Sequence, residues 1–327
     1  MRLIICKSCQ IFFVRSFFLL SIGCSNTSYK ESEILSIPVE FSIDRFDKKF
    51  HLSNADEIPK LKTTYPFLFP DKFSDSIWIK RQKDSLQLLL LENVDEKFNS
   101  LTLLEEDLEY LFKHLKYYFP KTKIPKVIGL INNVDYQSKI IYTDSLILIS
   151  LDTYLGADHY LYRGIPKYVR QEMDIKFLAS HVASKFAVNK IPLTKDRSLL
   201  SKMIYHGKQV YFKEWMLPKS SDGQKMGYTD AQIQWVTDNE KYIWQYFVQK
   251  QLLYNTDTSL TQRFIEPAPF SKFYLEIDNE SPGRVGVWLG WQIIRSYMNR
   301  YPNTGINDLL NLPAQTLFSK SNYKPRR

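Results

Sequence analysis

All three cysteines of the chain lie within its first 24 residues. Cys24 ends a short apolar run that follows a basic amino terminus, and a polar stretch comes directly after it. This order is typical of a bacterial lipoprotein, so residues 1–23 are predicted to be a signal peptide and Cys24 the lipidated residue. Cys6 and Cys9 then leave with the signal peptide, and no thiol remains for a disulfide or a cysteine zinc site. The mature chain must therefore be stabilised by an apolar core.

The apolar run before Cys24 is too short to span a bilayer, so the predicted attachment to a membrane is by acyl chains. Small residues at Ser21 and Gly23 suit a signal peptidase, although lipoproteins more often carry Leu at the position of Ser21. The alternative interpretation is that Cys24 is a buried cysteine at the start of an ordinary apolar helix.

Composition allows a large core and argues against a nucleic-acid partner. The chain is 44% hydrophobic and 15% aromatic, enough for one or two domains. Removal of the signal peptide lowers the formal net charge from +9 to +6. Lys and Arg are spread along the chain without a basic block before residues 324–327, whereas nucleic-acid binding needs a clustered basic face. An anionic lipid or cell-wall surface is a weaker alternative partner.

Hydrophobic periodicity predicts one α+β domain over residues 37–327, after a flexible tether over residues 24–36. A small sheet is expected to be followed by a large helical part. The predicted strands cover residues 39–43, 127–131, 139–142 and 146–149, the last one central in the sheet, with turns at 132–133 and 143–145. The predicted helices cover residues 71–98, 104–119, 168–187, 196–214, 229–253, 284–300 and 305–318, the fifth opened by a Thr229/Gln232 capping box.

Two helices carry glycines that need a structural reason, because glycine in a helix interior costs about 1 kcal/mol relative to alanine. Gly207 lies inside one predicted helix, and Gly286 and Gly290 lie four residues apart in another. This placement predicts that another backbone, or a ligand, approaches these helices closely.

Other residues have types that packing alone does not favour, and together they form a candidate binding cleft. A Tyr- and Gly-rich loop follows the most apolar strand, Glu240 and Trp244 share one side of a helix, and two arginines accompany the last glycines. Each also has a plainer structural interpretation, as a cap, a core residue or a solvated face. The candidates are Tyr154, Gly156, Asp158, Tyr162, His181, His206, Gly207, Lys208, Tyr211, Asn239, Glu240, Trp244, Arg284, Trp291 and Arg295.

These stretches together resemble the gliding motility lipoprotein family GldB of the Bacteroidota. The resemblance covers almost the whole mature chain and implies a membrane-anchored component of gliding and of the associated secretion machinery, with no established enzymatic activity. Its motifs are the Cys24 signal, Tyr154-Leu155-Gly156-x-Asp158, Gly207-Lys208-x-x-Tyr211-Phe212, Trp235-x-x-x-Asn239-Glu240-x-x-Ile243-Trp244, Ala268-Pro269-Phe270, and Ser281-Pro282-Gly283-Arg284 with Gly290-Trp291.

The arrangement is also similar to that of predicted zinc proteases, which implies a zincin-like fold. Zinc chemistry of that kind needs His-Glu-x-x-His on a helix and a further ligand on another helix. Here Val182 replaces the glutamate base and Lys185 the second histidine, while His206 lies near the expected position of the third ligand. An ammonium beside a divalent cation is repulsive, so we expect no metal or other cofactor and a packed or hydrogen-bonded His181.

The leading hypothesis is a non-catalytic lipoprotein that acts through contacts with other envelope proteins, with the periplasmic face of the outer membrane favoured over the inner membrane. A second hypothesis is a metal-dependent peptidase or hydrolase with atypical ligands. A third is a periplasmic module that binds a glycan or peptide through the Tyr-rich loop, Trp244 and Trp291. No nucleophile elbow, phosphate loop or dinucleotide fingerprint is present in the sequence.

Overall fold

The computed structural model describes residues 25–325, which fall into two units. The first ends at Pro38, and the second runs from Val39 onward. The predicted signal peptide and lipidation site Cys24 lie outside the described residues. Among the helices of residues 25–325, none combines the length and the apolar character that crossing a membrane requires.

The first unit contains helix α1 (Ser25–Leu35). The segment predicted to be a flexible tether, residues 24–36, is thus helical over most of its length. The second half of the helix includes Glu31, Glu33 and Leu35, which have high helix propensity. A polar segment without a regular apolar stripe can still be helical, and polarity alone did not reveal this.

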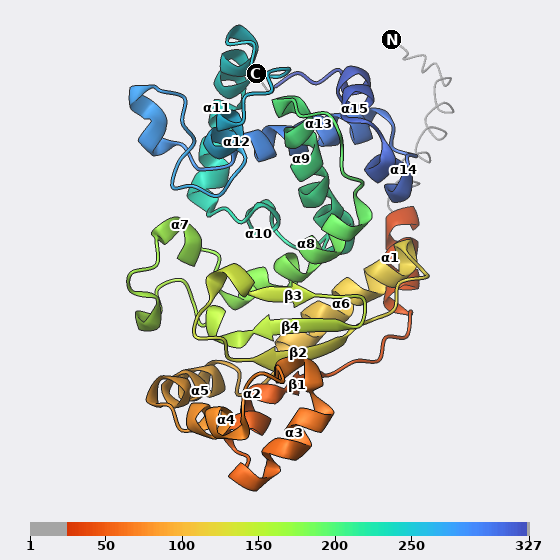
Figure 1. The fold of residues 1–327 in the computed structure, drawn as a ribbon. Helices are drawn as coiled ribbons and strands as arrows, with labels where there is room; N and C mark the ends of the chain where they lie inside the picture. Colours follow the sequence, from red (N-terminus) through yellow and green to blue (C-terminus); the bar gives the residue numbers. More distant parts are fainter. Residues whose placement is uncertain (1–24, 326–327) are drawn as a thin grey trace, which may run out of the picture. The chain divides into compact units, whose positions relative to one another are not determined.

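In the second unit, a four-stranded sheet lies between two layers of helices (Figure 1). Its strands are β1 (Ile43–Arg45), β2 (Lys126–Leu130), β3 (Ile140–Tyr142) and β4 (Leu146–Ser150). They are ordered β1-β2-β4-β3, with β1, β2 and β4 parallel and β3 antiparallel to β4. The predicted central position of the last strand is confirmed, and so is the turn at 143–145 that joins it to β3.

Two details of the predicted sheet were wrong. The first strand lies at residues 43–45 instead of 39–43. The turn at 132–133 does not join a hairpin, because β2 pairs in parallel with β4 and not with β3. The chain between β2 and β3 instead makes a longer connection, in which Asn133 and Val134 adopt positive φ angles of 54° and 56°.

Helices cover both faces of the sheet, which explains why the sequences of its strands are short apolar runs. On one face α6 (Thr102–Tyr118) and α8 (Leu178–Lys190) belong to the same apolar core cluster as Val127 and Ile147. The opposite face, which includes Ile128, is covered by four helices (Figure 1). They are α2 (Phe46–His51), α3 (Ile58–Thr64), α4 (Asp75–Gln82) and α5 (Ser85–Lys97).

The long helix predicted over residues 71–98 is in fact two helices, α4 and α5. The carboxylate of Asp84 accepts a hydrogen bond of 3.0 Å from the backbone N–H of Gln87 and so starts a new helix. The predicted helix over 168–187 is broken in the same way. Its parts are α7 (Lys167–Arg170) and α8, and Asp174 caps the 3₁₀ turn that leads into α8.

The remaining helices build a second apolar core. At its centre α9 (Leu199–Met216) and α13 (Val285–Arg300) cross closely. A Cβ atom on Gly290 would lie 1.9 Å from the carbonyl oxygen of Met203, and one on Gly207 would lie 2.5 Å from the carbonyl carbon of Gly290. The predicted close approach of another backbone is therefore confirmed. These helices are α9 (Leu199–Met216), α10 (Asp222–Met226), α11 (Asp230–Gln249), α12 (Ser259–Phe264), α13 (Val285–Arg300), α14 (Ile306–Asn311) and α15 (Ala314–Ser321).

The α+β class with a small sheet and a large helical part is confirmed. The capping box is confirmed as well, because Thr229 and Gln232 exchange hydrogen bonds between side chain and backbone at the start of α11. The helix predicted over 305–318 is divided into α14 and α15 at Pro313, which lacks the N–H that a helix interior needs.

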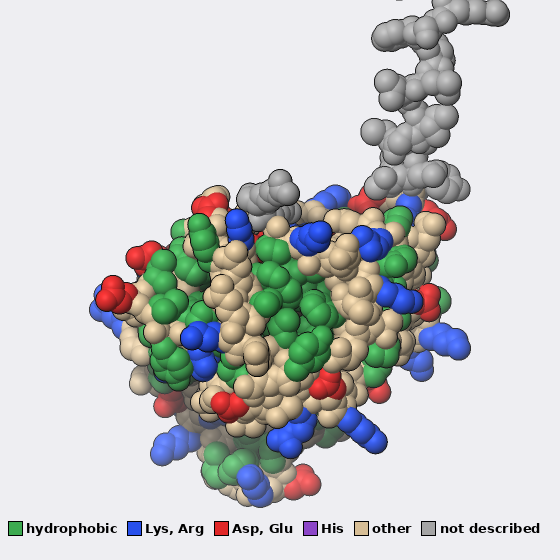
Figure 2. Space-filling model, turned by 90° about the horizontal axis from the view of Figure 1, so that it is seen from above, with side chains coloured by type: hydrophobic (Ala, Val, Ile, Leu, Met, Phe, Trp, Pro, Cys, Tyr) green, Lys and Arg blue, Asp and Glu red, His purple; other side chains and the backbone are tan. Residues whose placement is uncertain are grey.

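Hydrophobic side chains also gather into a group on the surface seen from above, with Lys and Arg side chains along its borders (Figure 2). Exposed aromatic residues of the second unit include Tyr242, Tyr254 and Tyr274. Single exposed hydrophobic residues are ordinary, but a group of them is a common feature of surfaces that contact other macromolecules.

Candidate functional site

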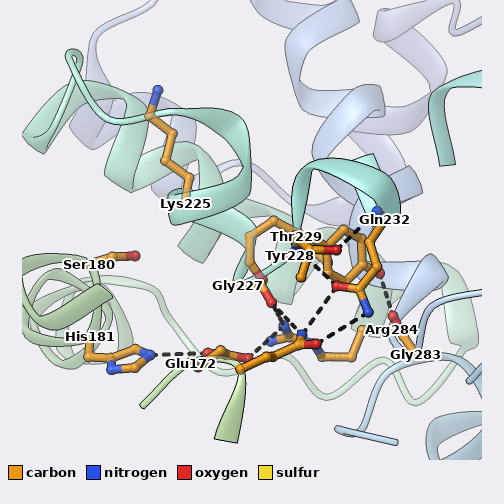
Figure 3. A network of polar contacts seen from close by, with 12 residues as sticks. Glu172, Ser180, His181, Lys225, Gly227, Tyr228, Thr229, Gln232, Gly283 and Arg284 are labelled. Atoms are coloured by element: carbon orange, nitrogen blue, oxygen red, sulfur yellow. Dashed lines mark hydrogen bonds and ion pairs between the residues drawn. The ribbon is translucent and has the colours of Figure 1, made fainter. Parts of the chain in front are cut away.

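His181 is the centre of a polar network that joins the sheet side of the molecule to the helical part. Its Nδ1 lies 2.9 Å from the hydroxyl oxygen of Tyr154, and its Nε2 lies 3.0 Å from Glu172 Oε2. His181 and Glu172 are mostly buried, with side chains 15% and 19% exposed. Glu172 lies in the break between α7 and α8, so the chain folds back to place its carboxylate against His181 (Figure 3).

The protonation of the network follows from its environment. Burial raises the pKa of Glu172, but Arg284 and His181 outweigh this effect and lower the pKa to about 2. Burial lowers the pKa of His181 to about 4, against a smaller opposite effect of Glu172. Glu172 is therefore ionised at pH 7 and can only accept, so the neutral His181 ring carries its proton on Nε2 and donates it to Glu172. Nδ1 is left to accept from the Tyr154 hydroxyl.

Arg284 closes the network from the start of α13. Its Nη2 donates to Glu172 Oε1 at 3.1 Å and to the carbonyl oxygens of Met226 at 2.7 Å and Gly227 at 3.4 Å. Arg284 has a left-handed backbone with φ of 65°, an unfavourable conformation for a residue with a side chain. The loop around it is held by Tyr228, whose hydroxyl donates to the carbonyl oxygen of Gly283 (Figure 3).

Gly227 is required at its position for two reasons. It ends α10 in the left-handed conformation with φ of 76°, which glycine adopts without strain. A Cβ atom there would also lie 2.6 Å from the carboxyl group of Glu172. The residue therefore lets Glu172 come close to the backbone that Arg284 also binds.

The network offers poor ligands for a metal. Both ring nitrogens of His181 are engaged by Tyr154 and Glu172, so no free lone pair points toward a vacant position. Lys185, at the position of the second histidine of a zinc helix, is exposed on the surface of α8. No cluster of three or more His, Cys, Asp or Glu residues suited to a metal occurs within residues 25–325.

A second network lies between α9, α10 and α13. Arg295 donates from Nε to Glu214 at 2.6 Å and from both Nη atoms to Asp222 at 2.8 Å. The guanidinium carbon lies 3.9 Å from the ring centroid of Trp291, whose indole N–H donates to the same Glu214 carboxylate. Trp291 itself is fully buried, so this group fixes the packing of three helices.

Of the residues in the Tyr-rich loop, Tyr154 alone joins the His181 network through a hydrogen bond. The Tyr162 hydroxyl donates to the carbonyl oxygen of Asp152 at 2.8 Å and accepts from the N–H of Leu155, so it organises the loop. Gly156 has φ of 125°, and the side chain of Asp158 is 97% exposed.

The candidates on α9 lie in different surroundings. Gly207 faces α13, and the Lys208 ammonium donates to the carbonyl oxygens of Leu310 and Leu312 at 2.8 and 2.7 Å. Tyr211 is buried in the helical core. His206 is partly buried, and its pKa is lowered to about 4 by burial and by the positive charge of Arg284 and Lys202. His206 therefore lies within the electrostatic reach of the network that contains Arg284.

Of the candidates on α11, Glu240 and Trp244 contact the carboxyl-terminal segment. Glu240 accepts a hydrogen bond of 2.7 Å from the hydroxyl of Tyr323. Trp244 makes ring contacts with Phe318 and Tyr323, and the Asn239 side chain donates to the carbonyl oxygen of Trp235 on its own helix. The structure thus brings together Tyr154, His181, Arg284 and, at longer range, His206, but not the full candidate set.

Glu172, which holds the network together, was not among the candidate residues. This residue lies within the helix predicted over 168–187, where a glutamate is expected to be on the solvent-exposed face. Asp174 accepts a hydrogen bond from the backbone N–H of Lys176 and marks a new helical start. An Asp cap at that position was the signal that could have exposed the break.

The network makes the stability of the protein sensitive to acid. An unfolded histidine takes up a proton below pH 6.5, whereas folded His181 and His206 do so only near pH 4. The unfolded state therefore binds more protons in this window, and the free energy of unfolding is expected to fall as the pH drops from 6.5 to 4. Urea titrations at several pH values measure this. The His206→Gln variant should lower the slope by up to about 1.4 kcal/mol per pH unit, and an unchanged slope would contradict the assignment.

The sequence profile of a family described as gliding motility protein GldB matches residues 27–325 of the chain. The searches of curated proteins and of solved structures found no significant match. The matched range contains both polar networks and all but the first two of the described residues.

Proposed function

Because the chain belongs to the gliding motility protein GldB family, we propose that it is a lipid-anchored envelope protein that supports gliding and the associated secretion machinery without catalysing a reaction. It acts through contacts with other envelope proteins. The favoured location is the periplasmic face of the outer membrane. The family match over residues 27–325 is the observation that carries this proposal.

The geometry of the His181 network supports a non-catalytic role. A general base or metal ligand needs a free nitrogen lone pair directed at a substrate or an ion. Nδ1 of His181 accepts from Tyr154 and Nε2 donates to Glu172, so both nitrogens are occupied by the protein itself. We propose that the scaffold has a zincin-like arrangement whose metal site is degenerate, with Val182 and Lys185 where a zinc helix has its base and second ligand.

Metal analysis of the purified mature protein tests this proposal. After dialysis against buffer with trace zinc, we expect far less than one zinc per chain, because the protein offers no set of three ligands among its described residues. The His181→Ala variant should have the same low metal content as the wild type. One zinc per chain that disappears in His181→Ala would instead favour a metal-dependent hydrolase.

The anchor has its own test. The Cys24→Ala variant is expected to lose stable membrane association, because the acyl chains have no thiol to which they can attach. Fractionation of cells followed by a carbonate wash measures the membrane-bound share, with Ser25→Ala as the matched control that keeps the cysteine. Full recovery of Cys24→Ala in the washed membranes would contradict lipid anchoring at this residue.

A further inference from the structure

A partly enclosed cavity of about 170 Å³ lies at the carboxyl ends of β1 and β2. Phe46 and Asp47 line it directly after β1, and Ile131 and Asn132 line it directly after β2. The remaining lining residues are Phe50, His51, Leu68, Phe69, Trp78, Arg81, Gln87 and Leu130. Parallel sheets commonly bind ligands outside the carboxyl ends of their strands, so this cavity has the position of a ligand site.

Aromatic side chains form the apolar wall of the cavity. Phe46, Phe50, Phe69 and Trp78 are buried. The ring centroids of Phe69 and Trp78 lie 4.9 Å apart, and those of Phe50 and Trp78 lie 6.4 Å apart. Aromatic rings attract a further ring that lies edge-on or offset against them. An apolar cavity of about 150 Å³ holds one benzene molecule, so this cavity has room for one six-membered ring.

Trp78 also contributes a polar group that has no partner. Its indole N–H is buried, and none of the described residues accepts a hydrogen bond from it. Buried tryptophan N–H groups usually have an acceptor, because an unpaired donor away from water costs free energy. A ligand that carries an acceptor and lies against Trp78 can offset this cost.

Arg81 carries the one charge of the lining that has no partner within residues 25–325. The carboxylate of Asp47 is neutralised by Arg45, whose Nε and Nη2 donate to it at 2.9 and 2.6 Å. Burial lowers the pKa of His51, so its ring is neutral at pH 7. Arg81 lies three residues after Trp78 in α4, and the two side chains therefore project from the same side of that helix. The cavity thus combines an aromatic wall with an unpaired positive charge.

We propose that this cavity binds a small aromatic carboxylate, with its ring among the aromatic side chains and its carboxylate at Arg81, on the side of α4 that also carries the Trp78 indole. A guanidinium group binds a carboxylate through charge-assisted hydrogen bonds, which are stronger than those between neutral groups. The inference goes beyond the proposed function, since it gives the protein a small-molecule ligand whether or not it acts in gliding.

Thermal unfolding of the purified mature protein, followed by tryptophan fluorescence at pH 7 and constant ionic strength, tests the proposal. The probes are phenylacetate, which has the ring and the charge, phenylacetamide, which has the ring alone, and acetate, which has the charge alone. We expect phenylacetate to raise the unfolding temperature saturably and acetate to leave it unchanged. Phenylacetamide should need about tenfold more for the same shift, because it lacks the charge-assisted hydrogen bond.

Arg81→Gln is the decisive variant. Arg81 has no hydrogen bond or ion pair among the described residues, so its replacement should leave folding intact. We expect the variant to need about tenfold more phenylacetate than the wild type and to respond equally to phenylacetate and phenylacetamide. Lys80→Gln is the matched control, because it removes an exposed positive charge of α4 that does not line the cavity.

Three results would overturn the proposal. They are the absence of a saturable shift with phenylacetate, equal responses of the wild type to phenylacetate and phenylacetamide, and a response of Arg81→Gln equal to that of the wild type. Membrane fractionation and metal content are independent of all three, so failure of this inference is distinguishable from failure of the proposed function.

Discussion

Gly290→Ala is expected to destabilise the protein by about 3 kcal/mol or more, although alanine is the better helix former. The new Cβ atom would lie 1.9 Å from the carbonyl oxygen and 2.4 Å from the carbonyl carbon of Met203, both backbone atoms of α9. Neither atom can move aside as a flexible side chain can, so α9 and α13 must separate and the packing between them is lost. Urea unfolding of the purified protein measures the change.

The sign of this effect is as informative as its size. Helix propensity alone predicts that Gly290→Ala stabilises α13 by about 1 kcal/mol. The tertiary contact predicts the opposite sign. Asn299→Ala is the matched control, because Asn299 is exposed on the same helix and its replacement should change stability by no more than about 0.5 kcal/mol. A Gly290→Ala variant as stable as the wild type would show that the two helices do not cross at this position.

Trp291→Ala is expected to cost about 3–5 kcal/mol, because it removes a fully buried indole ring and leaves a cavity in the helical core. It also removes the N–H that donates to Glu214 and the ring face against which Arg295 packs. Trp291→Phe separates the two contributions. It keeps most of the packing and should cost about 1–2 kcal/mol for the lost hydrogen bond.

The same pair of variants distinguishes a core residue from a ligand-binding one. A tryptophan that served as a binding platform would lie exposed, and its loss would weaken ligand binding with little effect on stability. Tyr242→Ala is the control for an exposed aromatic residue, since Tyr242 is 68% exposed on α11, and it should change stability by no more than about 0.5 kcal/mol. Unfolding free energies of Trp291→Ala and Tyr242→Ala that are equal would contradict the buried position of Trp291.

Contacts that a residue type requires by itself could be predicted from the sequence. Contacts that depend on a partner from another segment of the chain could not. The close backbone approach predicted at Gly207 and Gly290 is confirmed, because a glycine in a helix interior is unfavourable by itself and such an approach is a common reason for it. His181 was correctly expected to be hydrogen-bonded, because Lys185 and Val182 make a zinc helix unworkable. Its partners could not be predicted, since they come from separate segments of the chain.

Glu172 illustrates why those partners remained hidden. It lies nine residues before His181 in a segment with helical periodicity, and in one continuous helix the two side chains could not meet as they do. Because the chain turns between α7 and α8, the Glu172 carboxylate comes back toward α8, and its Oε2 lies 3.0 Å from Nε2 of His181. Arg284 joins them from 112 residues further along the chain. Such a contact depends on the packing of α13 against the rest of the helical part.

The sequence by itself determined the periodic elements, the α+β class, the Thr229 capping box and the need for a close helix crossing, because these depend on residues that are neighbours along the chain. The tertiary structure decided where helices break, which charged groups meet, and that Trp244, Glu240 and Trp291 serve packing instead of a cleft. The physical reason is that burial and the pairing of charges depend on distances between segments far apart in the sequence. The spacing of residue types along the chain does not specify those distances.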